Sequence, residues 1–223
     1  MKDESTGPLH KLATEGLAKG RVEALTDGIM AVAMTILVLD IKFDGTEAIT
    51  TDGHLLSHLL DVERTFTVYL TSFIVLGMFW VAHHIQFHFV RRVDRGLLWI
   101  NLAFMLLVTI VPFTTSVMID YEQLMVPILL YGANLMLLSF ALLANLHYVA
   151  RHPQFADDGL TPEVVAYIRR RLLLFATIPA LSMAVAPFSV RASLYLYAGM
   201  AILHFMPRTI DQHVSRWLER PRR

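Results

Sequence analysis

The stretch from Arg21 to Lys42 constrains this chain more than any other feature, because it is almost wholly apolar between Asp27 and Asp40. As one α-helix it would reach about 30 Å, the thickness of a bilayer core. It nevertheless carries Asp27 and Thr35, and a carboxylate within a membrane helix is costly and usually faces protein or water. The stretch is therefore predicted to be the first membrane helix and the functional helix.

Five further apolar runs follow, and charged links separate them. The chain is 55% hydrophobic, with a mean hydropathy of +0.52, which is typical of a membrane protein that crosses the bilayer several times. We predict an all-α integral membrane protein with six transmembrane helices in one domain (21–207), preceded by a polar cytoplasmic lead-in (1–20) and followed by a basic cytoplasmic tail (208–223). The further runs cover about 65–89, 96–119, 124–148, 172–190 and 192–205.

The distribution of basic residues predicts the orientation in the cell membrane. All lysines and arginines except Lys42, Arg64 and Arg191 fall in the lead-in, at the start of the first helix (Arg21), in the tail and in two of the links. One of these links is read as a long polar loop that ends in Arg169-Arg170-Arg171. Because cytoplasmic segments carry the excess of basic residues, both termini are predicted to be cytoplasmic. The formal net charge is zero, so nothing indicates nucleic-acid binding, and without cysteine there can be no disulfide or cysteine-ligated metal.

Helical spacing places Val32, Ile36 and Leu39 on one face of the first helix. Thr35 and Asp40 flank this face, and Asp40 is predicted near the external end, where a ring of carboxylates would attract cations. Asp27 is expected to point into the protein and to bond another helix. Periodicity alone leaves two interpretations open, a pore-lining face and ordinary helix packing.

A cluster of histidines ends the second run, with His83, His84 and His88 close behind Trp80. His84 and His88 are four residues apart and could form a metal-binding pair, so a membrane-embedded metal enzyme is one alternative. The other interpretation is a set of hydrogen-bonded side chains that hold helices together, with Asn101 as a partner. A proton or cation transporter is a further alternative, although few charges fall at mid-membrane positions.

Several motifs together resemble the transmembrane protein 175 family, the endolysosomal potassium channels and their prokaryotic relatives. Arg21-Val-Glu-Ala-Leu25-Thr26-Asp27 resembles the family signature of arginine, three residues, then Phe-Ser-Asp, with leucine and threonine replacing phenylalanine and serine. The second and third runs add Trp80-x-x-His83-His84, Leu98-Trp99-Ile100-Asn101-Leu102 and Val111-Pro112-Phe113.

The resemblance implies a potassium-permeable channel, not an enzyme, with potassium as the permeant ion and no cofactor or metal. It implies a homotetramer embedded in membrane lipid, with the first helices lining a central pore. Its apolar constrictions would fall on Val32, Ile36 and Leu39, beside the pore-flanking Thr35. A network that holds the pore helices in place would comprise Arg21, Thr26, Asp27, Trp80, His83, His84 and Asn101.

Overall fold

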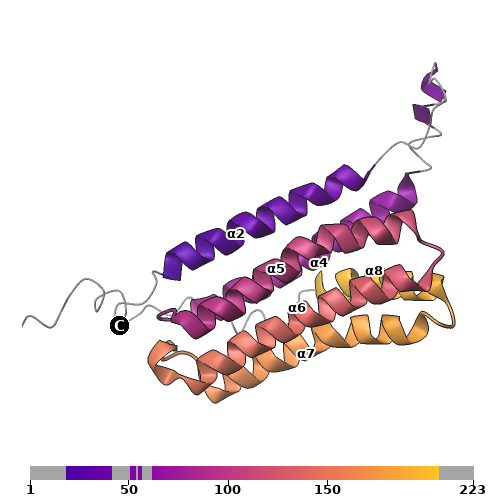
Figure 1. Cartoon of the computed structure of the whole chain (residues 1–223). Coiled ribbons are helices and arrows are strands. Elements are labelled where there is room, and N and C mark those ends of the chain that lie inside the picture. The colour runs from indigo at the N-terminus through magenta and orange to yellow at the C-terminus, as the bar shows by residue number, and fades with distance from the viewer. Residues whose placement is uncertain (1–18, 42–50, 54, 57–61, 206–223) are drawn as a thin grey trace, which may run out of the picture.

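The computed structural model describes residues 19–41, 51–53, 55–56 and 62–205, and this part of the chain folds into a bundle of long helices (Figure 1). A short 3₁₀-helix, η1 (Leu37–Asp40), continues the first helix, and a second, η2 (Pro153–Phe155), follows the fourth. The α-helices are α2 (Lys19–Ile36), α4 (Glu63–His88), α5 (Arg95–Asp120), α6 (Met125–Arg151), α7 (Pro162–Val185) and α8 (Val190–Phe205).

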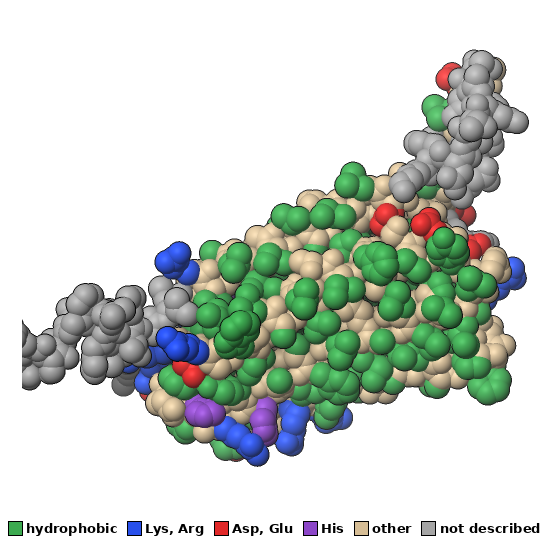
Figure 2. Space-filling view, in the orientation of Figure 1, with side chains coloured by type: hydrophobic (Ala, Val, Ile, Leu, Met, Phe, Trp, Pro, Cys, Tyr) green, Lys and Arg blue, Asp and Glu red, His purple; other side chains and the backbone are tan. Residues whose placement is uncertain are grey.

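The prediction of an all-helical membrane protein is confirmed, and six helices lie at the six apolar runs. Four segments of the described chain are long and apolar enough to cross a membrane, namely Lys19–Asp40, Thr65–His88, Arg95–Asp120 and Met125–Arg151. The helices α7 and α8 do not belong to this set. Figure 2 shows apolar side chains over most of one face of the bundle, with lysine, arginine and histidine gathered toward one end.

The first and fifth helices differ from the sequence prediction in their bounds. The first helix is α-helical only to Ile36 and then tightens into η1, because its last turn adopts the 3₁₀ geometry common at helix ends. Lys42, its predicted end, lies outside the described residues. The link before the fifth run is not a loop throughout, since α7 begins at Pro162. Thr161 caps it by accepting a hydrogen bond from the Val164 amide, and proline suits the first helical position.

The core lies between α4, α5, α6, α7 and α8, and α2 packs along the outside of the bundle and adds Met30 and Ala33 to the core (Figure 1). Only one stripe of α2 is buried, at Val22, Thr26, Met30 and Ala33, and Leu37 extends it into η1. These residues recur every three or four positions, which places them on one helical face. The opposite face of α2 therefore has no partner within the described chain.

Asp94 caps the start of α5 and joins this helix to α6. Its carboxylate accepts hydrogen bonds from the Leu97 amide (2.9 Å) and from the Tyr148 hydroxyl (2.6 Å). Partial burial alone would raise the pKa of this carboxyl, but these hydrogen bonds outweigh it and hold the pKa below its ordinary value. The charged form of Asp94 is thus the one that stabilises the fold.

We predict that Asp94→Ala lowers the free energy of unfolding by about 1 kcal/mol at neutral pH, because the cap of α5 is lost. Because the pKa of Asp94 is lowered in the folded protein, the stability that this carboxylate contributes is complete above the ordinary carboxyl pKa. It disappears as the pH falls through the pKa of the folded state. The difference between wild type and variant should therefore shrink below about pH 4. Unfolding in detergent across a pH series would measure it. Asp158→Ala is the control, since its ion pair with Arg91 is exposed and should contribute little.

Candidate functional site

The predicted pore-lining side chains lie on the exposed face of α2 and η1. Val32 is 57% exposed, Ile36 43% and Leu39 68%. Thr35 is exposed beside them, and its hydroxyl donates to the Val32 carbonyl at 2.8 Å. Asp40 is half-buried at the end of η1. Packing within the described part of the chain therefore does not account for these branched apolar residues.

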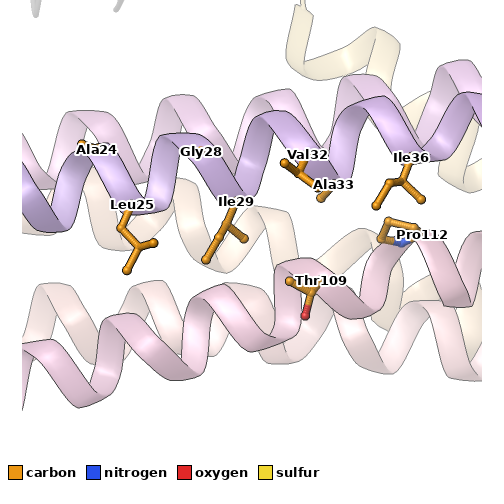
Figure 3. Close-up of a pocket in the computed structure, with 9 residues that line it drawn as sticks. All are labelled: Ala24, Leu25, Gly28, Ile29, Val32, Ala33, Ile36, Thr109 and Pro112. Atoms are coloured by element: carbon orange, nitrogen blue, oxygen red, sulfur yellow. The ribbon is translucent and has the colours of Figure 1, made fainter.

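A shallow apolar groove of about 430 Å³ runs between this face of α2 and helix α5 (Figure 3). Figure 3 shows Ile29 and Ile36 directed toward the α5 residues Thr109 and Pro112. The Thr109 hydroxyl donates to the carbonyl of Leu106 in its own helix at 2.7 Å. The groove thus offers almost no free polar group. Its lining comprises Ala24, Leu25, Gly28, Ile29, Val32, Ala33, Ile36, Thr109 and Pro112.

A buried hydrogen-bond network joins α2, α4 and α5 behind the exposed face. The Asn101 amide nitrogen donates to the Thr26 hydroxyl at 2.9 Å, and Thr26 donates to the Val22 carbonyl, also at 2.9 Å. The Asn101 oxygen lies 2.8 Å from His83 Nε2. Because an amide oxygen only accepts, His83 must carry its proton on Nε2 here. One asparagine thereby connects three helices.

His83 is enclosed by aromatic rings. It is 2% exposed and stacks on Phe87 and Phe104, with centroid separations of 4.2 and 5.1 Å. Both the hydrogen bond and the stacking fix the orientation of its ring. His84, in contrast, is exposed and stacks on Trp80 at 5.8 Å. The neighbouring histidines thus point in different directions.

Asp27 contacts α4 at the surface. Trp80 Nε1 donates to the Asp27 carboxylate at 2.8 Å, so Asp27 does bond another helix. The expectation that it points into the protein is wrong, because its side chain stays exposed. Arg21 is exposed on the same helix, one and a half turns before Asp27.

No group of three metal ligands is found around His83, His84 and His88 in the described residues. Within the part of the chain that the structure describes, no three His, Asp or Glu side chains converge as metal ligands.

Sequence reasoning did not single out Gln86, two residues beyond His84. Gln86 and Asn145 are buried, and both side-chain amide atoms of each have no hydrogen-bond partner among the described residues. The sequence signal that could have identified Gln86 is a glutamine inside an apolar run.

We predict that Asn101→Leu destabilises the protein by about 1 kcal/mol, because it leaves His83 and Thr26 without their shared partner. The thermal stability of the purified protein in detergent would measure the loss. Thr109→Val is the matched control on α5, since that hydroxyl bonds only its own helix. Equal stability of the Asn101 variant and wild type would show that the amide does not hold the three helices.

Comparison with known proteins agrees with the helices and motifs described above. The family model "Endosomal/lysosomal potassium channel TMEM175" matches residues 21–112. A potassium channel of Streptomyces collinus is 40% identical over 102 residues, which cover 46% of this chain and 48% of that protein. One of Chamaesiphon minutus is 39% identical over 109 residues, covering 49% and 53%. The matched segments thus span about half the length of these relatives.

A solved structure extends the likeness beyond the first three helices. The crystal structure of a lysosomal potassium-selective channel TMEM175 homolog from Chamaesiphon minutus superposes with a TM-score of 0.70 at 28% identity. The superposition covers 83% of this chain and 95% of that one. The resemblance inferred from the sequence motifs is therefore confirmed: the first half of the chain matches the TMEM175 family model, and the chain shares the fold of a TMEM175 homolog.

Proposed function

We propose that the chain forms a potassium-permeable channel in which four copies surround a central axis with α2 innermost. The observation that carries this proposal is the exposed apolar face of α2 and η1, with Val32, Ile36 and Leu39 at helical spacing and uncovered by the chain's own bundle. The family model and both bacterial relatives bear the description of potassium channels, which supports potassium as the permeant ion.

In the proposed assembly, each of the three side chains contributes to a ring of four. Rings of branched apolar side chains close a pore sterically or by excluding water. A small outward shift or rotation of α2 would open them, because α2 is held to the bundle by one buried stripe. Thr26, Asn101 and His83 would set the resting position of α2, with Arg21, Asp27, Trp80 and His84 at its edge.

The proposed topology has six membrane spans per chain, with α7 and α8 as the fifth and sixth. Both termini are then cytoplasmic, and a cell membrane is the proposed location. Asp40 would lie at the external mouth, where four carboxylates attract cations. Residues 1–18 of the lead-in (1–20) and the whole tail (208–223) lie outside the described residues.

The channel proposal predicts that Ile36→Asn increases potassium flux, because a polar side chain lowers the cost of hydrating an apolar constriction. Flux into liposomes that contain the purified protein would measure it. Leu137→Asn is the matched control, since Leu137 is a similarly exposed apolar residue on α6, outside the proposed pore. No flux from either wild type or the Ile36 variant, with the protein intact, would contradict the proposal.

Val32→Ile is expected to increase the preference for potassium over sodium, because the extra methylene narrows the ring and forces more complete dehydration of the ion. Reversal potentials under mixed potassium and sodium gradients would measure the preference. Ile36 stays unchanged in this variant, so the effect of the first ring is isolated. An unchanged or lower preference would show that Val32 does not form the selective constriction.

A further inference from the structure

Three consecutive arginines occupy an unusual position in α7. Arg169, Arg170 and Arg171 lie in the second and third turns of a continuous helix, not in a loop. Arg169 and Arg170 are exposed and Arg171 is half-buried. Among the described residues, no ion pair joins Arg169 or Arg170 to a carboxylate. Their charge is therefore available to a ligand from outside the chain.

Helix contacts show how deep these arginines lie in the bundle. Phe175 packs edge-on against Phe79 of α4, with ring centroids 5.7 Å apart. Because α7 runs antiparallel to α4, the residue four positions before Phe175 lies at the same depth in the bundle as the residue four positions after Phe79. This places Arg171 level with His83. The contact between Met183 and Gly132 of α6 likewise places Arg170 level with Asn145.

The arginines thus lie about 9 Å, or nearly two turns, inside the end of α6 at Arg151. The apolar part of α7 runs only from 172 to 185, about 21 Å. The neighbouring spans, Arg95–Asp120 and Met125–Arg151, are nearly 40 Å long. A bilayer core of about 30 Å therefore matches α5 and α6 but is too thick for α7.

An arginine within the hydrocarbon region is costly unless polar lipid groups reach it. The helix surface favours such a contact, because Arg169 and Leu173, and Arg170 and Leu174, are pairs four residues apart. Leu173 is 49% exposed and Leu174 46%, and the exposed Leu181 continues this stripe two turns further. A cationic group thus adjoins an apolar track, as a phospholipid requires.

Nearby carboxylates among the described residues do not neutralise Arg169 and Arg170. Arg169 lines one end of a cleft of about 480 Å³ that also contains Asp157 and Asp158. The Asp157 carboxylate accepts from the Gly159 amide at 3.1 Å, and Asp158 pairs with Arg91 at 3.0 Å. Glu163, on the same helix, lies two turns from Arg170 toward the basic end of the bundle.

We propose that Arg169 and Arg170 bind the headgroup phosphate of an anionic phospholipid whose acyl chains lie along Leu173, Leu174 and Leu181. The lipid draws the headgroup layer inward at α7 and so fits the bilayer to the short apolar part of this helix. The proposal requires only that the chain is embedded in a membrane, and it does not depend on which ion the protein conducts.

The test compares phosphatidylglycerol with phosphatidylcholine of the same acyl chains, each added to the delipidated full-length protein and counted by native mass spectrometry. Wild type is expected to retain at least one phosphatidylglycerol per chain in preference to phosphatidylcholine. Arg169→Gln/Arg170→Gln should weaken that preference about 30-fold. Arg92→Gln/Arg95→Gln is the matched control, because it removes the same charge from two exposed positions, one in the link before α5 and one at the first residue of α5, and it should leave the preference unchanged.

Equal retention of the two lipids by wild type would overturn the proposal. So would an unchanged preference in the Arg169/Arg170 variant, or an equal loss in the control. Thermal melting in the same detergent shows whether each variant is folded. If the glutamine variant is not, Arg169→Lys/Arg170→Lys keeps the charge and should keep most of the preference; its loss in that folded variant would contradict binding by charge.

Discussion

The position of α2 depends on the amide of Asn101. Inside a bilayer, lipid tails are as apolar as side chains, so packing and hydrogen bonds rather than burial decide how helices associate. Asn101 is fully buried and bonds Thr26 on one side and His83 on the other. Since Thr26 must face α5 for this contact, the rotation of α2 is fixed, and Val32 and Ile36 are turned away from the buried stripe.

The sequence predicted much of this arrangement, because apolar runs and helical spacing report local physics. The six runs coincide with six helices, and Asn101 was expected to be a histidine partner. The start of α7 was missed because a run of charged residues is interpreted as a loop. In the structure, Arg169 to Arg171 lie inside a helix that Thr161 caps and Pro162 begins. Asp27 was expected inside, but an indole on α4 satisfies its carboxylate at the surface.

Hydropathy could not separate the two faces of α2, since Met30 and Val32 are both apolar. Met30 is buried against the bundle, whereas Val32 is 57% exposed. Whether an exposed apolar side chain meets lipid, a groove or a pore depends on neighbouring molecules, and one chain's sequence does not encode that directly. The motif resemblance supplied this context, and the uncovered face of α2 is consistent with it.

Two helices on opposite sides of the bundle have apolar segments of nearly equal length. The interval from Asp27 to Asp40 on α2 and η1 and the interval from 172 to 185 on α7 are each about 20 Å. Asp27 contacts Trp80, and Arg171 lies level with His83, so both segments begin within one turn of the same depth. The proposed rings from Val32 to Leu39 span about 10 Å of that interval. If the bilayer is thinned at α7, the edge of its hydrocarbon core at the basic end of the bundle lies at the depth where the apolar part of the pore helix begins. The lipid site is thereby linked to the length of pore over which ions must be dehydrated.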